Sequence, residues 1–117
     1  NLILSNRQLV FNCLNINEKE LIADNPYYQK GTKVKKGCQI DYMIQTKFGS
    51  LYVCEIKFSI RPIGLDIIGE IEAKISALSV PKGISIRPVL ICVNGVTKEL
   101  GDSGYFSNII ISKDLFL

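Results

Sequence analysis

Residues 37 to 59, GCQIDYMIQTKFGSLYVCEIKFS, restrict the fold more than any other part of the chain. Apolar and aromatic residues alternate along this stretch in the pattern of a buried β-hairpin. At its centre, residues 47–49 (KFG) match the three-residue turn in which a left-handed glycine follows a type I turn. The two arms also contain Asp41, Glu55 and Lys57, although charged residues are costly inside a buried sheet. These three charges are the first candidates for function.

The length of the turn decides whether the three charges share one face of the sheet. Successive side chains of a strand alternate between faces, so Glu55 and Lys57 point the same way. A three-residue turn pairs Thr46 with Ser50. Counting outward from that pair places Asp41 opposite Glu55 and diagonal to Lys57. A turn that is one residue shorter or longer would move Asp41 to the other face.

Two facing carboxylates repel one another, so a positive group should lie between Asp41 and Glu55. That group is either Lys57 or a hard divalent ion such as Mg²⁺, for which the backbone carbonyl of Ile56 is an additional ligand. With an ion present, Lys57 would orient or deprotonate an attacking water while the ion neutralises charge on a phosphate. The alternative is an ion pair between Glu55 and Lys57 on a solvated strand face, with Asp41 nearby by chance.

The distribution of basic residues supports a phosphate-containing substrate. The net charge is only +3, but four lysines lie within seven residues just before Asp41: Lys30, Lys33, Lys35 and Lys36. Such a cluster can follow the phosphates of DNA or RNA, although many lysine runs are simply solvated loops. The chain contains no histidine, so hydrolysis would have to use carboxylates, lysine or a metal ion.

The remaining residues predict helices before and after the hairpin. Apolar residues recur at helical spacing over residues 2–14, and a capping arrangement of Asn17 with Glu20 predicts a short helix that ends at Pro26. Residues 27–36 are expected to be irregular or an edge strand. Residues 62–79 predict a major helix, on which Glu70 and Lys74 are spaced as an i,i+4 ion pair.

The C-terminal third predicts two further strands, the first of a parallel type. Residues 87–95, RPVLICVNG, form a continuous apolar run typical of a strand buried on both faces, and residues 108–112 predict a last short strand. The order helix, hairpin, helix, strand favours an α/β fold with three layers, α/β/α, around a mixed sheet of four to five strands.

The composition fits a single globular domain over residues 1–117. No apolar run approaches the roughly 18 to 20 residues that cross a bilayer. The four cysteines lack metal-ligand spacing, and Cys54 and Cys92 lie in apolar strands, so we expect buried thiols and a cytoplasmic location. Because the chain begins with Asn1, we expect it to be a C-terminal piece of a longer protein.

An Asp on one arm of a hairpin and Glu-x-Lys on the next resembles the PD-(D/E)xK, or restriction-endonuclease-like, nuclease superfamily. More narrowly, NPYYQKG, KKGCQIDYMIQT, LYVCEIKFS and RPVLICVNGV resemble the nuclease-like domain at the C-terminus of certain prokaryotic AAA-type ATPases. The likeness spans nearly the whole chain. It implies that Asp41 and Glu55 bind Mg²⁺ or Mn²⁺, that Lys57 serves catalysis, and that the substrate is DNA or RNA.

The chain departs from the superfamily pattern in two places. Ile40 replaces the usual proline before the Asp, and its side chain is expected to point away from the site. The first helix often contributes another acidic residue, whereas residues 1–16 contain none. Members also often have Gln on the helix after Glu-x-Lys, and here Glu72 and Lys74 are the possible accessory residues.

The sequence therefore supports three hypotheses. The first is a metal-dependent nuclease domain that hydrolyses phosphodiester bonds of DNA and is attached to an AAA-type ATPase. The second is a catalytically inactive module of the same fold that binds nucleic acid or docks on an ATPase. The third is an interaction domain that binds neither metal nor nucleic acid.

Overall fold

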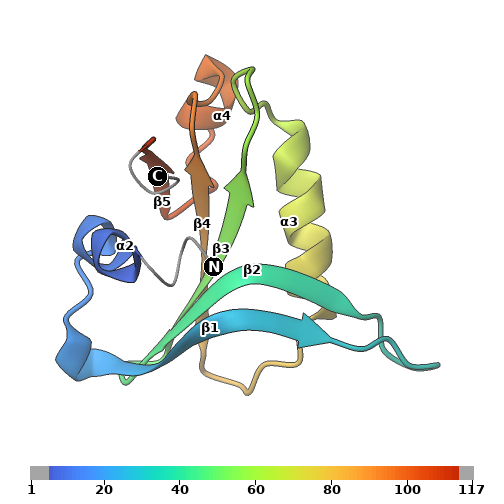
Figure 1. The fold of residues 1–117 in the computed structure, drawn as a ribbon. Coiled ribbons are helices and arrows are strands. Elements are labelled where there is room, and N and C mark those ends of the chain that lie inside the picture. Colours follow the sequence, from blue (N-terminus) through green and yellow to red (C-terminus); the bar gives the residue numbers. More distant parts are fainter. Residues whose placement is uncertain (1–5, 114–117) are drawn as a thin grey trace.

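The computed structural model describes residues 6–113, which form a five-stranded sheet with helices on both faces (Figure 1). The predicted hairpin consists of β2, Cys38–Thr46, and β3, Ser50–Lys57. Gly49 closes the turn with a φ of 76°, and its N–H donates to the carbonyl of Thr46 at 3.3 Å. The register between β2 and β3 over residues 42–45 and 51–54 is the one that a three-residue turn requires.

The edge of the sheet beside β2 is formed by β1, Leu21–Gln29, which pairs with it antiparallel. The prediction of a short helix ending at Pro26 is wrong. The capping box of Asn17 and Glu20 is present, but Glu18–Glu20 forms only one 3-10 turn. The chain is extended from Leu21 onward, and an edge strand tolerates Pro26 because one side of it needs no ladder partner.

On the other side of the hairpin, β4, Ser85–Cys92, runs parallel to β3, as predicted. β5, Asn108–Ile111, confirms the last short strand and runs parallel to β4. Two parallel strands need a crossover, which is supplied by the helix α3, Asp66–Ala77. This helix begins later than the predicted residue 62 because Ile63 forms a parallel bridge with Val96.

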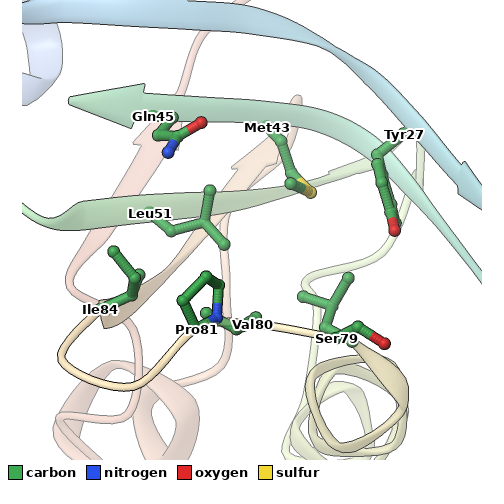
Figure 2. Close-up of a pocket in the computed structure, with 9 residues that line it drawn as sticks. Tyr27, Met43, Gln45, Leu51, Ser79, Val80, Pro81 and Ile84 are labelled. Carbon is green, nitrogen blue, oxygen red and sulfur yellow. The ribbon is translucent and has the colours of Figure 1, made fainter.

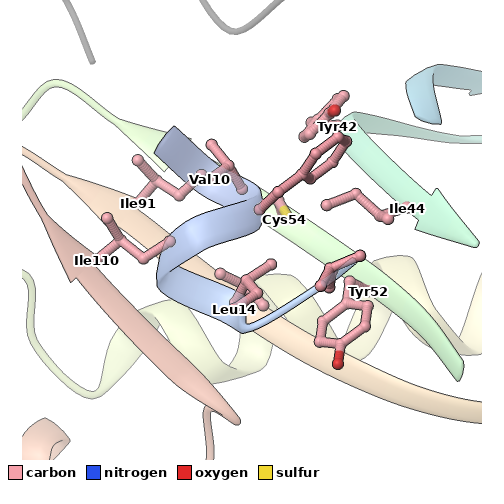
Figure 3. Packing of buried hydrophobic residues seen from close by; sticks show 11 residues of the cluster. Val10, Leu14, Tyr42, Ile44, Tyr52, Cys54, Ile91 and Ile110 are labelled. Carbon is pink, nitrogen blue, oxygen red and sulfur yellow. The ribbon is translucent and has the colours of Figure 1, made fainter. Parts of the chain in front are cut away.

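Helices cover both faces of the sheet. The first helix, α2 (Arg7–Leu14), confirms the prediction for these residues, while residues 2–5 lie outside the described part. Figure 3 shows α2 packing on one face, where Val10 and Leu14 meet side chains of the central strands. On the opposite face lie α3 and the short helix α4, Lys98–Asp102. The structure is therefore the predicted three-layer α/β/α arrangement.

The four cysteines are free thiols, and Cys54 and Cys92 are buried, as the apolar strand pattern predicted. Burial raises the pKa of both thiols, so they act as small apolar groups of the core. Within residues 6–113, no helix combines the length and the apolar composition needed to cross a membrane.

Candidate active site

Asp41 lies at a bulge of β2. Between the pairs Asn25↔Met43 and Tyr27↔Ile40, Pro26 alone stands opposite two residues of β2, one of which is Asp41. Such a bulge shifts the alternation of side chains, and proline is accepted there because it has no N–H to pair.

The bulge brings the carboxylate of Asp41 to β3. Its Oδ2 accepts a hydrogen bond from the backbone N–H of Ile56 at 2.8 Å, next to the last described backbone pair, Tyr42↔Cys54. The bulge also moves Ile40 to the α3 face, where it packs with Val53 and Leu78. The expectation that Ile40 points away from the site is therefore wrong, because strict alternation does not allow for the extra residue.

Glu55 is a buried carboxylate, with 3% of its surface exposed. Lys74, on α3, donates to both of its oxygens, at 3.0 Å to Oε1 and 2.9 Å to Oε2. The Nζ of Lys57 is farther away, 3.8 Å from Oε1. Burial raises the pKa of Glu55, the hydrogen bond from Lys74 opposes this rise, and the charge of Asp41 adds to it. The charges of Lys74, Asp41 and Lys57 therefore all influence the protonation of Glu55.

Lys57, at the end of β3, forms an ion pair with Glu70 of α3. Its Nζ lies 3.1 Å from Oε2 of Glu70, and this bond raises the pKa of Lys57 above its ordinary value. The ammonium therefore remains protonated at neutral pH. Of the two roles considered for Lys57, orienting an attacking water and removing a proton from it, the protonated state suits the first.

The predicted i,i+4 pair between Glu70 and Lys74 is wrong. Each of these residues instead contacts a charge on β3: Glu70 pairs with Lys57, and Lys74 pairs with Glu55. The cause is the packing of α3 over the sheet. It brings Glu70 and Lys74 closer to the charged residues of β3 than they are to one another.

The two possible accessory residues have different places. Lys74 belongs to the site, whereas Glu72 accepts a hydrogen bond from the hydroxyl of Tyr105, beyond α4. The i,i+4 spacing of Glu70 and Lys74 could have indicated a role in the site. It places both residues on one side of a helix, and that helix packs against a strand that contains Glu55 and Lys57. Sequence spacing by itself could not show that the partners would come from β3.

The carboxylates of Asp41 and Glu55 fit a hard divalent ion. Mg²⁺ is commonly held by one or two protein carboxylates together with several waters. Asp41 is half-buried and its charge raises the pKa of the buried Glu55, so the two carboxylates lie close enough to form such a pair. Over residues 6–113, no cluster of three or more acidic or cysteine side chains is suitably placed to hold a metal. The remaining ligands would have to be waters, backbone carbonyls such as that of Ile56, or substrate oxygens.

The four lysines of the predicted phosphate-binding cluster are exposed on the connection between β1 and β2, residues 30–37, which projects from the sheet (Figure 1). The base of this connection is tight, because a Cβ on Gly37 would lie only 2.6 Å from the carbonyl oxygen of Gln29. Gln29 donates to the carbonyl of Ala77 at 2.6 Å, and Lys35 donates to that of Leu78 at 3.4 Å. These bonds attach the basic connection to the C-terminal end of α3.

Two hollows flank α3. A groove of about 380 Å³ lies between the basic connection and the helix, lined by Val34, Lys35, Lys36, Ala73, Ser76 and Ala77. Figure 2 shows a smaller pocket, about 130 Å³, between the hairpin and the segment that follows α3. Its lining is mainly apolar, including Met43, Leu51 and Ile84, and none of the predicted site residues lines it.

No protein-family model matches the chain, and no curated protein matches it significantly. Among solved structures that resemble it, a protein of unknown function, AF1548, has a TM-score of 0.60 at 18% identity, over 95% of this chain and 57% of the other. A repair endonuclease from Pyrococcus abyssi has a TM-score of 0.53 at 19% identity, over 92% of this chain and 45% of the other. The chain thus spans about half the length of each of these proteins. At these identities the likeness concerns the fold, and it agrees with the predicted restriction-endonuclease-like architecture.

Proposed function

We propose that this domain is a metal-dependent nuclease that hydrolyses phosphodiester bonds of DNA. The observation that carries the proposal is the meeting of three groups at one point of the sheet. Asp41 is hydrogen-bonded to the backbone of Ile56 at 2.8 Å, and Glu55 and Lys57 flank that residue on the same strand, with Nζ 3.8 Å from Oε1. Two carboxylates and an ammonium in a half-buried position are suited to phosphoryl chemistry without histidine.

In this proposal Asp41 and Glu55 hold the ion, which would polarise the scissile phosphate and supply an activated water when bound. The N–H of Ile56 keeps the Asp41 carboxylate oriented toward β3. Lys57, kept protonated by Glu70, orients the attacking water and stabilises negative charge on the phosphate. The lysines of the basic connection would contact phosphates farther along the strand.

Two further observations support the proposal. A solved structure of similar fold is a repair endonuclease, which is what would be expected if this fold served DNA cleavage here as well. The basic connection is attached to α3, the helix that also contributes Glu70 and Lys74, so substrate contacts and the site share one support. We also propose that an AAA-type ATPase, in the same chain or a partner, is the physiological context of the domain.

The test is cleavage of DNA by the purified protein with Mg²⁺ or Mn²⁺. We expect Asp41→Ala and Lys57→Ala to reduce the rate by about 100-fold or more, because each removes a group that acts in the transition state. Asp102→Ala and Lys82→Ala are matched controls, since they make the same changes at exposed positions that are not part of the proposed site. If both site variants cleave as fast as the controls, the proposed function is wrong.

A second candidate is a non-catalytic nucleic-acid-binding module of the same fold. It is favoured by Lys74, which already forms an ion pair with Glu55, and by the lack of an acidic residue on α2. This candidate predicts salt-sensitive DNA binding with no metal-dependent cleavage. Cleavage that depends on both Asp41 and Lys57 would exclude it.

A further inference from the structure

We propose that Lys74 is the resident counter-ion of Glu55 and that a divalent ion must displace it to enter the site. This inference rests on the proposed function, and it concerns a residue that would set the metal affinity of the site. It follows from the contacts of Glu55.

The ammonium group of Lys74 contacts both oxygens of the Glu55 carboxylate. Nζ of Lys74 lies 3.0 Å from Oε1 and 2.9 Å from Oε2 of Glu55, while the side chain of Glu55 is only 4% exposed. A metal ion would need at least one of these oxygens at about 2.0 to 2.1 Å. Two cations so close together in a poorly hydrated place repel strongly, so the ammonium and the ion exclude one another.

Lys57 is not the residue that must leave. It is 3.8 Å from one oxygen of Glu55 and has a shorter contact, 3.1 Å, with Glu70. Lys57 can therefore keep its place when the ion arrives. Lys74 differs, because over residues 6–113 its only ion pair is the one with Glu55.

The structure also provides a place for the displaced side chain. Ala73, Ser76 and Ala77 of α3, the neighbours of Lys74, line the groove that faces Lys35 and Lys36. The charges of Lys74 and Lys35 both lower the pKa of the Cys38 thiol against the larger effect of burial, so both lysines lie near Cys38, at the beginning of β2. Once released, Lys74 would add a positive charge to the groove, where a phosphate of the substrate can bind.

The test measures metal affinity rather than cleavage. Mn²⁺ is titrated calorimetrically into the wild type and into Lys74→Gln, with Lys82→Gln as the control that removes one exposed ammonium elsewhere. We expect Lys74→Gln to bind Mn²⁺ about tenfold more tightly than the wild type, because the ion no longer competes with an ammonium. Lys82→Gln should bind as the wild type does.

A third variant keeps the test decisive if Lys74→Gln does not fold. Lys74→Arg retains the charge and can form a forked pair with the Glu55 carboxylate, so it should bind Mn²⁺ more weakly than the wild type. Thermal unfolding without metal identifies which variants are folded. Opposite effects of Gln and Arg, or the Arg effect alone when Gln fails to fold, support the displacement of Lys74.

The outcomes separate this inference from the proposed function. If folded Lys74 variants bind Mn²⁺ as the wild type does, while Asp41→Ala abolishes binding, Lys74 is not the competitor and the metal site stands. If neither the wild type nor any folded Lys74 variant binds Mn²⁺, the metal-dependent function and this inference both fail. Binding by Lys74→Gln alone would show that the counter-ion keeps the metal out of the wild-type site.

Discussion

Glu55 combines a buried position, a raised pKa and two lysine neighbours. Burial is the larger influence on its pKa, so the charged form is stabilised by Lys74 but not fully compensated. The protonation of such a residue depends on its burial and on its charged partners. Its behaviour with pH can be stated with a definite sign.

We expect metal binding to weaken as the pH falls. The loss should begin at a higher pH than it would if the metal ligand were a glutamate of ordinary pKa. The ordinary pKa is about 4.3, and in this protein burial raises it. As the pH falls through the raised pKa, Glu55 takes up a proton, and the protonated carboxyl group no longer binds the ion. Calorimetric titrations of Mn²⁺ from about pH 7 down to about pH 5 measure this effect.

The same group has the opposite effect on stability. The native state binds the proton of Glu55 more readily than the unfolded chain does, so its contribution to the free energy of unfolding falls as pH rises from the ordinary to the raised pKa. Glu55→Gln removes this dependence. A stability profile that is unchanged in Glu55→Gln over that window would show that Glu55 does not titrate as described.

At the scale of elements, the hairpin depends on its turn and on the bulge of β2. Gly49 has a φ of 76°, which only glycine adopts without strain, and no heavy atom lies closer than 3.5 Å to the position of an added Cβ. Backbone conformation rather than space is thus the reason for glycine there. Gly69 lies in the interior of α3, has no neighbouring atom within 4 Å of an added Cβ and has no such conformation to maintain.

One substitution should therefore have opposite effects at these two glycines. Gly49→Ala should lower the free energy of unfolding by about 1 to 2 kcal/mol, because alanine is strained at positive φ. Gly69→Ala should raise it by about 0.5 to 1 kcal/mol, because alanine favours helix and restricts the unfolded chain. Denaturant unfolding measures both changes. A loss of stability in Gly69→Ala would contradict the open surroundings of that position.

At the scale of the whole molecule, α3 links the site to the basic connection. Its middle contributes Glu70 and Lys74, and the carbonyls at its C-terminal end accept hydrogen bonds from Gln29 and Lys35. The net charge of +3 is too small to attract DNA over the whole surface. Binding should therefore depend on where the lysines are, which a salt titration can measure.

Replacing the four lysines of the basic connection by Gln should reduce the salt dependence of DNA binding. If each contacts one phosphate of a duplex, the slope of log Kobs against log salt should become less steep by about 3 to 4. The control replaces four lysines elsewhere with the same change of charge: Lys19, Lys47, Lys82 and Lys98. Equal changes in the two variants would mean that the basic connection is not the DNA-binding surface.

Much of the fold follows from local chemistry in the sequence. The KFG turn determined the register of β2 and β3, the apolar run of β4 predicted a buried parallel strand, and the spacing of isoleucines predicted α3. The failures also have local causes. A capping box marks the start of a helix but does not supply the apolar stripe that would continue it, so the segment from Leu21 became an edge strand.

By itself, the sequence determined that Glu55 and Lys57 share a strand face and that Asp41 lies near them, since strand alternation and turn length are local properties. Only the tertiary structure decided the bulge at Asp41, the place of Ile40 and the partners of Glu70 and Lys74. The physical reason is that a charged side chain pairs with whatever opposite charge packing brings within reach. For α3 that charge comes from β3, and a helix considered alone cannot reveal it.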